Sequence, residues 1–183
     1  MPCNISKGLQ LACKDSVAGI QAVYFLNYNQ AGYNVTSSVS TDEVTGLGSV
    51  TAYKYEVKGA NNNLQDNINS SRDNGTTFFE QVVNVQFQKL TASTNKELKL
   101  MSYGRPQMVV HTYAGDAFLV GKNNGMELTA GSIQTGTALG DLYGYTATFT
   151  GNEQLYSQFI TGSTVANPFA GISGVTVVTG SAA

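Results

Sequence analysis

The stretch 118–154 constrains the fold most, because strand and turn signals fill it and few of its side chains are reactive. Residues 122–125, Lys-Asn-Asn-Gly, predict a turn, since Asn and Gly tolerate positive φ. The turn would join an apolar run at 117–120 to a short strand at 126–129, and we expect a hairpin there. In 143–150, tyrosine, alanine and phenylalanine alternate with glycine and threonine. This alternation predicts a strand with one aromatic and one hydroxyl face, and the aromatic face requires a partner sheet.

The charge content limits the classes of partner. The 183 residues fit one domain that can bury a substantial core. Charged residues make up 12% of the chain and hydrophobic residues 42%, so neutral polar groups must cover much of the surface. Such a surface is poorly protected against self-association. The net charge of −2 provides no overall basic field of the kind that binds nucleic acid by neutralising phosphates.

Membrane and secretion signals are weak in this sequence. No apolar run approaches the roughly 18 residues of a membrane span, and the opening Met-Pro-Cys-Asn lacks the charged-then-apolar order of a signal peptide. We therefore expect a protein that is made and used without secretion. Cys3 and Cys13 are too few for a disulfide scaffold, and neither belongs to a zinc-binding pattern. Reduced or buried thiols in an N-terminal arm, residues 1–18, are the favoured interpretation.

Three segments of the first half read as strands. Residues 20–28 are apolar on both alternating sets, which predicts a strand buried on both faces. Residues 50–58 alternate, with a threonine, two tyrosines and a valine on the expected core face. The longest strand candidate is 77–90, whose apolar face carries Phe79, Val83, Val85 and Phe87. Its opposite face carries Glu80, Asn84, Gln86 and Gln88.

The stretch 60–75 has the Asn, Asp, Ser and Gly content of a mobile loop. Long loops in compact domains are usually functional or disordered, so we interpret this one as a contact arm for assembly. The candidate assembly residues are Asn61, Asn62, Asn63, Asp66, Asn69, Arg72 and Asp73.

One short helix is expected at about residues 95–103. Thr94 and Glu97 have the spacing of a capping box, and Gly104 followed by Pro106 predicts the end of the helix. Strands spaced closely around a single helix indicate a mainly β fold, an antiparallel β-sandwich or a partly closed barrel. We expect a single domain over 1–183, with a C-terminal extension at 161–183 that contains one more apolar run, 174–178.

Catalytic patterns are missing from the sequence. His111 is the only histidine, and its place in a strand favours a hydrogen-bonded structural role over that of a base. No GxSxG, HExxH or P-loop pattern occurs. The acidic residues are scattered, so a glycosidase pair or a cation site near Asp66 and Asp73 is a weak alternative. We expect no catalytic, cofactor-binding or metal-binding residues, and no enzyme.

Three segments carry a resemblance to a known family. They are 3–24, with Cys-Asn-Ile near its start and Gly-Ile and Val-Tyr near its end; 120–129, Val-Gly-Lys-Asn-Asn-Gly-Met-Glu-Leu-Thr; and 144–151, Gly-Tyr-Thr-Ala-Thr-Phe-Thr-Gly. Together they resemble virion structural proteins of tailed bacteriophages, and most of all the tail tube (major tail) proteins. The resemblance covers about a third of the chain and rests on strand-and-turn segments rather than on a catalytic signature.

The resemblance implies a tail-tube-like fold whose copies close into rings of six, stacked into a conduit for the genome. It implies a place in the virion tail, with assembly in the bacterial host cytoplasm. The implied partners are further copies of the chain and other tail proteins, such as a tape measure, a terminator or a sheath. DNA would pass without specific binding, and no membrane would be involved. In such a ring, Glu80, Asn84, Gln86 and Gln88 have the character expected of a channel lining, although a merely solvated strand face is an equal alternative.

A different virion β-module also fits the composition. A head-decoration, fibre, receptor-binding or carbohydrate-binding domain would share it, and would use exposed tyrosines as stacking platforms. The candidate platforms are Tyr28, Tyr33, Tyr53 and Tyr55.

Overall fold

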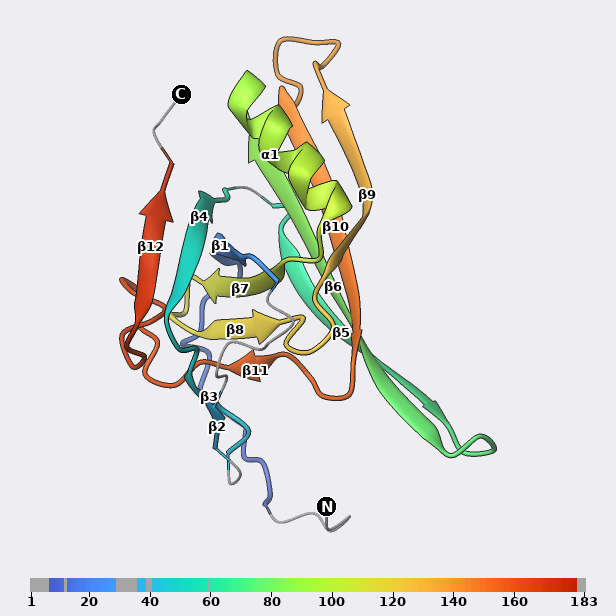
Figure 1. The fold of residues 1–183 in the computed structure, drawn as a ribbon, viewed down its shortest axis with the longest axis vertical. Helices are drawn as coiled ribbons and strands as arrows, with labels where there is room; N and C mark the ends of the chain where they lie inside the picture. Colours follow the sequence, from blue (N-terminus) through green and yellow to red (C-terminus); the bar gives the residue numbers. More distant parts are fainter. Residues whose placement is uncertain (1–6, 12, 29–35, 39–40, 59, 181–183) are drawn as a thin grey trace.

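The computed structural model describes residues 7–11, 13–28, 36–38, 41–58 and 60–180. The fold is mainly β with one helix, as predicted, and two sheets pack face to face as a sandwich (Figure 1). A six-stranded sheet has the order β11 (Gln158–Phe159), β8 (Ala117–Val120), β7 (Gln107–Thr112), β1 (Ile20–Leu26), β4 (Val50–Glu56) and β12 (Val175–Thr179). A four-stranded sheet has the order β5 (Asn63–Ser71), β6 (Thr76–Gln88), β10 (Gly144–Glu153) and β9 (Glu127–Gln134). Both sheets keep free edges among the described residues, so the fold is a sandwich and not a closed barrel.

The main core lies between the two sheets. It joins Val23 and Phe25 of β1 to Val85 of β6 and Phe149 of β10, all buried. Phe25 and Phe149 are in ring contact, with centroids 5.3 Å apart. The aromatic face predicted for 143–150 therefore has its partner sheet. Aromatic and aliphatic side chains of this size dominate the stability of a core.

A second core covers the outer face of the six-stranded sheet. Tyr24 and Leu26 of β1 point into it, on the opposite side from Val23 and Phe25. It is closed by β3 (Val44–Gly46), which pairs with β2 (Thr36–Ser37), and by Phe169 and Ile172 near the C-terminus. The prediction that this strand is buried on both faces is confirmed. One detail differs, since a register irregularity after Ile20 moves that residue to the main core.

The segment 161–183, expected as an extension, is part of the fold as far as it is described. Its 161–174 stretch supplies side chains to the second core, and β12 pairs parallel with β4. The predicted strand at 174–178 is thus present, but it breaks the purely antiparallel pattern. The face predicted for 50–58 is confirmed only in part. Tyr55 and Val57 pack in the main core, but Thr51 and Tyr53 are exposed. Val50 and Ala52, on the opposite face, are buried in the second core.

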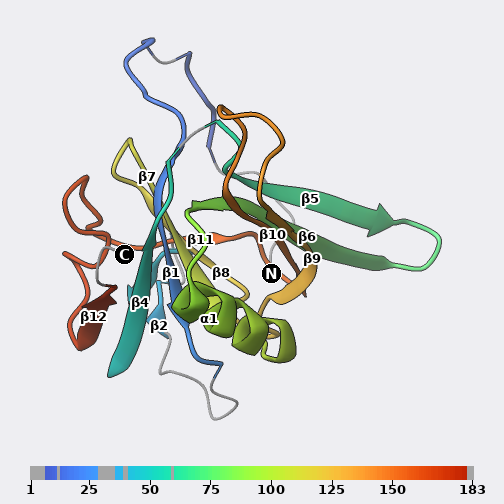
Figure 2. The same cartoon turned by 90° about the horizontal axis from the view of Figure 1, so that it is seen from above.

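The helix α1 (Ala92–Tyr103) begins earlier than predicted and ends at the predicted residue. Its N-cap is Thr91, whose hydroxyl oxygen accepts a hydrogen bond from the Thr94 backbone N–H at 3.1 Å. The Thr94–Glu97 capping box is therefore wrong, because the three-residue spacing that matters starts at Thr91. Figure 2 shows α1 across one open side of the sandwich, between β4 and β9.

The turn at 122–125 forms, but it does not make the predicted hairpin. Gly125 has a φ of +75°, and its N–H donates to the Gly121 carbonyl at 3.1 Å. A Cβ at Gly125 would lie 2.7 Å from the Arg105 carbonyl oxygen, so glycine is needed there. The turn carries the chain from β8 in one sheet to β9 in the other. Local turn chemistry was right, while the pairing of the flanking strands depends on the hydrophobic contacts of the whole sandwich.

The Asn-rich stretch 60–75, predicted as a mobile loop, forms β5 and a short turn. All nine residues of β5 pair with β6, from Asn63 opposite Asn84 to Ser71 opposite Thr76. Figures 1 and 2 show the far end of this hairpin projecting beyond the rest of the molecule. The composition argued for disorder, but backbone pairing to a long, well-packed neighbour orders a strand whatever its side chains.

Candidate functional surface

The outer face of the four-stranded sheet is the clearest candidate for a functional surface. Strand pairing places Glu80, Asn84, Gln86 and Gln88 on it, together with Thr146, Thr148 and Thr150 of β10. The alternate residues of β6, Val83, Val85 and Phe87, are buried in the main core. The four residues predicted as one polar face are therefore brought together as expected, and Phe79 lies on the opposite face, in contact with Tyr156.

Side-chain amides and hydroxyls cross-link this outer face from strand to strand. Asn84 donates to the Asn63 side-chain oxygen at 3.0 Å and accepts from the Thr148 hydroxyl at 2.7 Å. Gln86 accepts from the Asn61 amide at 2.9 Å. Cross-strand polar pairs of this kind hold side chains in place and satisfy their hydrogen bonds within the face.

The charge of the face is weakly negative. Glu80 accepts a hydrogen bond from the Asn67 amide at 3.3 Å, and Glu127 of β9 lies opposite Thr150 near the edge. No lysine or arginine occupies an outward position among the described residues of these four strands. The face consists mainly of amides and hydroxyls, with a few carboxylates and the apolar side chains of Phe78 and Val82. It offers no counter-charge to phosphates.

The predicted assembly residues lie in three places: beside the outer face, at the far end of the hairpin, and, for Asp66, on its inner side. Asn61 and Asn63 belong to the amide network of the outer face. Asn62 is buried and accepts a hydrogen bond from the Gln86 backbone N–H at 2.8 Å. Asn69, Arg72 and Asp73 lie at the far end of the β5–β6 hairpin.

Asp66, the last of these residues, points to the inner side of the hairpin. Its Oδ2 accepts from the Ser157 N–H and hydroxyl, at 2.8 and 2.7 Å. Alternation of Leu64 and Ile68 with amide residues in β5 was the sequence signal that could have revealed this strand.

A buried polar junction that sequence reasoning missed ties the sheets together. Glu153, 3% exposed, accepts the backbone N–H groups of Asn123 and Asn124 at 2.8 and 2.7 Å. Buried Gln81 accepts the Gly121 N–H at 2.8 Å and donates to the Leu155 carbonyl at 3.2 Å. These side chains satisfy the tight turn that links the sheets, so their role is structural.

Lys122 extends the junction to the β2–β3 hairpin. Its Nζ donates to the Ser37 hydroxyl and the Gln158 side-chain oxygen, both at 2.7 Å. Burial lowers the pKa of Lys122, against the opposing effect of the nearby Asp42 and Glu153 carboxylates.

His111 has the structural role predicted for it. It is 2% exposed, and its Nε2–H donates to the Thr164 carbonyl at 2.9 Å. Burial lowers its pKa, so the neutral ring is favoured. No group of three or more His, Cys, Asp or Glu side chains suited to a metal occurs in the described part of the chain. Within the same residues, no helix is long and apolar enough to cross a membrane.

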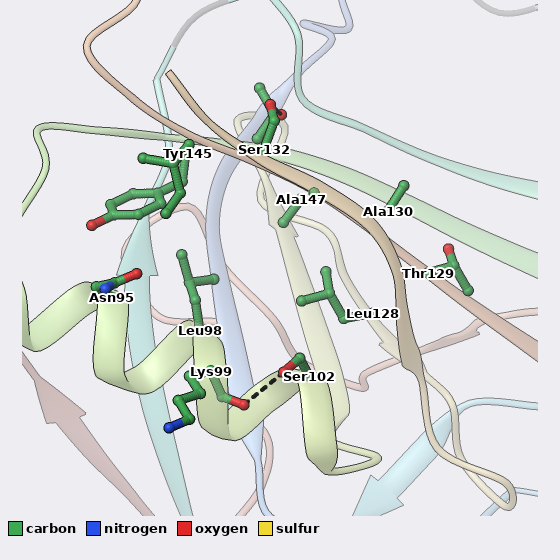
Figure 3. Close-up of a pocket in the computed structure, with 13 residues that line it drawn as sticks. Asn95, Leu98, Lys99, Ser102, Leu128, Thr129, Ala130, Ser132, Tyr145 and Ala147 are labelled. Atoms are coloured by element: carbon green, nitrogen blue, oxygen red, sulfur yellow. Dashed lines mark hydrogen bonds between the residues drawn. The ribbon is translucent and has the colours of Figure 1, made fainter. Parts of the chain in front are cut away.

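Two hollows flank the helix. One, of about 400 Å³, lies between α1 and β9 and is lined by Leu98, Leu128 and Tyr145 (Figure 3). The other, of about 650 Å³, is lined by Tyr28, Tyr53 and Tyr55.

Three of the four tyrosines predicted as stacking platforms thus share one hollow, while Tyr33 lies outside the described residues. Arg105 stacks over the Tyr28 ring, 5.0 Å from its centroid. Burial raises the pKa of Tyr55 to about 12, so its hydroxyl stays protonated.

Comparisons of the chain with protein-family models, with curated proteins and with solved structures find no match.

Proposed function

We propose that this protein is a structural subunit of a bacteriophage tail tube, and that its copies close into rings, with six as the expected number, which stack into a conduit for DNA. The observation that carries the proposal is the outer face of the four-stranded sheet. It is wide, ordered by its own hydrogen bonds and poor in positive charge. Such a face suits the wall of a channel through which DNA must move without adhering.

The edges of the same sheet support ring formation. β5 and β9 are its two outermost strands, and each presents an unpaired backbone edge among the described residues. β9 is mostly exposed along its length. Unprotected edges drive association, and a closed ring removes them by pairing each edge with a neighbour. The polar outer faces of successive copies would then form one continuous inner wall.

Electron microscopy of the purified protein tests the proposal directly. Negatively stained samples at high protein concentration, alone and with tail-assembly partners, are expected to contain rings or tubes with a central channel. Light scattering should show the same assembly in solution. Monomers alone in every condition would contradict the proposal.

A charge substitution tests which face lines the channel. Gln86→Lys with Gln88→Lys adds two positive charges per copy to the outer face. Particles with this change should assemble normally but release DNA slowly at low salt, because each neutralised phosphate strengthens binding through counterion release.

The matched control for this charge substitution is Ala166→Lys with Ala170→Lys. Both alanines are exposed near Phe169, on the side of the second core. The control should release DNA at the normal rate. Normal release by both variants would show that the outer face does not line the channel.

The alternative function is a carbohydrate- or receptor-binding virion module. The hollow with Tyr28, Tyr53, Tyr55 and Arg105 favours it, since aromatic rings beside a guanidinium group suit sugar rings with polar substituents. Glycan-array binding that is lost in Tyr53→Ala, from a protein that never forms rings, would favour this alternative.

A further inference from the structure

The N-terminal arm presents apolar side chains that have no partner within the described chain. Residues 7–11 and 13–18 form no helix or strand. Leu9 and Leu11 are 101% and 103% exposed, which means that they contact nothing beyond their immediate neighbours. Figure 2 shows this blue segment standing away from the two sheets. Burial of two fully hydrated leucines against an apolar surface would lower the free energy of the system.

An apolar groove lies on the open flank of the sandwich, between β5 and the β8–β11 pair. It consists of two neighbouring cavities of about 720 and 390 Å³ that share Asp66, Phe118 and Ser157. The Phe118 and Phe159 rings are in contact along it, with centroids 4.4 Å apart. Leu64 lines the larger cavity and Leu155 the smaller one. The groove is large enough to hold several aliphatic side chains.

The charges of arm and groove are complementary. Asp42 and Asp66 line the groove, and no lysine or arginine occurs among the described residues that line its two cavities. The Asp66 Oδ1 is buried without a hydrogen-bond partner. A positive charge close to this oxygen would offset the cost of its burial. The arm carries Lys7 and Lys14.

The spacing of the arm fits the groove. In an extended chain alternate residues point to the same side, so Lys7, Leu9, Leu11 and Cys13 would share one side. We propose that residues 7–17 of one copy dock in the groove of a second copy, with Leu9 and Leu11 on the Phe118–Phe159 pair and Lys7 near Asp66. The interaction requires only two copies of the chain, so it stands independently of any tube.

The exposure of the arm favours a second copy over the chain's own arm as the occupant of the groove. Ala18, Gly19 and Ile20 line the groove, and the Tyr113 N–H donates to the Gly19 carbonyl at 3.0 Å, so the arm leaves the body at the groove wall. Leu9 and Leu11 are nevertheless fully exposed, so the arm does not occupy the groove of its own copy. Each copy can donate one arm and accept another.

Disulfide trapping between two distinguishable chains tests the proposal. The first chain carries Cys3→Ser, keeps Cys13 in the arm and has a size tag. The second carries Cys3→Ser and Cys13→Ser, with a groove cysteine at one end of the groove or the other, Tyr113→Cys or Tyr156→Cys; both tyrosines are partly exposed. Under mild oxidation we expect a mixed dimer with at least one groove cysteine, since disulfides need Cβ atoms about 3.5–4.5 Å apart.

Two controls make the trapping specific. Tyr103→Cys, exposed on α1 away from the groove, should give at least tenfold less mixed dimer. Leu9→Ser with Leu11→Ser in the first chain should reduce trapping by a similar factor, and Asp66→Asn in the second chain should reduce it severalfold. Matching thermal unfolding curves would show that the variants fold.

Three outcomes overturn arm docking, and a fourth separates it from the proposed tube. Equal trapping at Tyr103→Cys would indicate random collision. A single chain with both Cys13 and a groove cysteine that yields only oxidised monomer would show that the arm occupies its own groove. Tubes that form without any mixed dimer would refute arm docking and leave the proposed tube standing. Mixed dimers without tubes would refute the tube and leave arm docking standing.

Discussion

The two sheets of the sandwich use their faces differently. The six-stranded sheet buries β1 on both faces, with Phe25 in the main core and Leu26 in the second. The four-stranded sheet buries only its inner face and leaves amides and hydroxyls on the other. Burial on both faces makes one sheet the structural centre of the molecule. The sheet that is buried on one side is free to present a surface to a partner, and we place the proposed channel wall there.

The largest effect is expected from Phe149, which lies between the two sheets and is 0% exposed. Phe149→Ala should lower the free energy of unfolding by about 3–5 kcal/mol through lost burial and a residual cavity. The adjacent Thr150→Ala, on the outer face, should change it by less than about 0.5 kcal/mol. Urea unfolding of both variants measures the contrast. Similar losses of unfolding free energy in the two variants would show that the outer face of β10 contributes to stability as much as its buried face.

The second effect concerns the junction between the sheets. Glu153→Ala removes the acceptor of two turn N–H groups and should cost about 2–4 kcal/mol, because hydrogen bonds to a charged group are stronger than neutral ones. Glu127→Ala, at an exposed carboxylate of the sheet edge, is the control and should be nearly neutral. Amide hydrogen exchange should locate the change at Asn123 and Asn124. Unchanged protection there would rule out this account of Glu153.

The third prediction uses pH to probe the second core. The folded-state pKa of His111 is lowered below its ordinary value of 6.5, so below about pH 6.5 the unfolded chain binds a proton more readily than the folded one. The stability contributed by the neutral ring is therefore present above that pH and is lost as the pH falls from there through the folded-state value.

His111→Gln keeps a donor for the Thr164 carbonyl and should cost about 1–2 kcal/mol at neutral pH. It should also flatten the decline in stability between pH 7.5 and 5.5. Urea midpoints of both proteins at the two pH values provide the comparison. Parallel declines would show that His111 is not the titrating group.

The smallest effect is expected on the outer face itself. Asn84→Ala breaks the hydrogen bonds to Asn63 and Thr148, but water can replace them at this partly exposed position. The isolated chain should lose about 0.5–1 kcal/mol. A loss as large as that of Phe149→Ala would show that the amide network is a second core rather than a presented surface.

How far the sequence could predict the structure varies between elements. Alternation in β6 and β10 predicted both their faces, and the apolar sequence of β1 predicted burial on two sides, because side-chain period is a local property. The end of α1 was predicted from Gly104. By contrast, the start of α1 was predicted too late in the chain. Both Thr91 and Thr94 are suitable N-caps, and the sequence alone does not distinguish them.

The candidate surface was only half predictable. Its β6 residues were identified, but Asn61 and Asn63 were assigned to a mobile loop because their composition is that of disordered segments. Asn63 is ordered by strand pairing with Asn84 of β6, and the Asn61 side chain by a hydrogen bond to Gln86 of the same strand, both far away along the chain. The groove beside Phe118 and the junction at Glu153 had no sequence signal, as each gathers residues from several distant strands.

By itself, the sequence determined the class of fold, the inward and outward faces of β6 and β10 and the turn at 122–125, since each depends on neighbours within a few residues. Only the tertiary structure decided which strands pair. It sent β8 and β9 to different sheets, joined β12 to β4 in parallel and made a strand of the Asn-rich stretch. The physical reason is that strand pairing satisfies backbone groups common to every residue, so the partner is chosen by the burial of the whole sandwich and not by the local side chains.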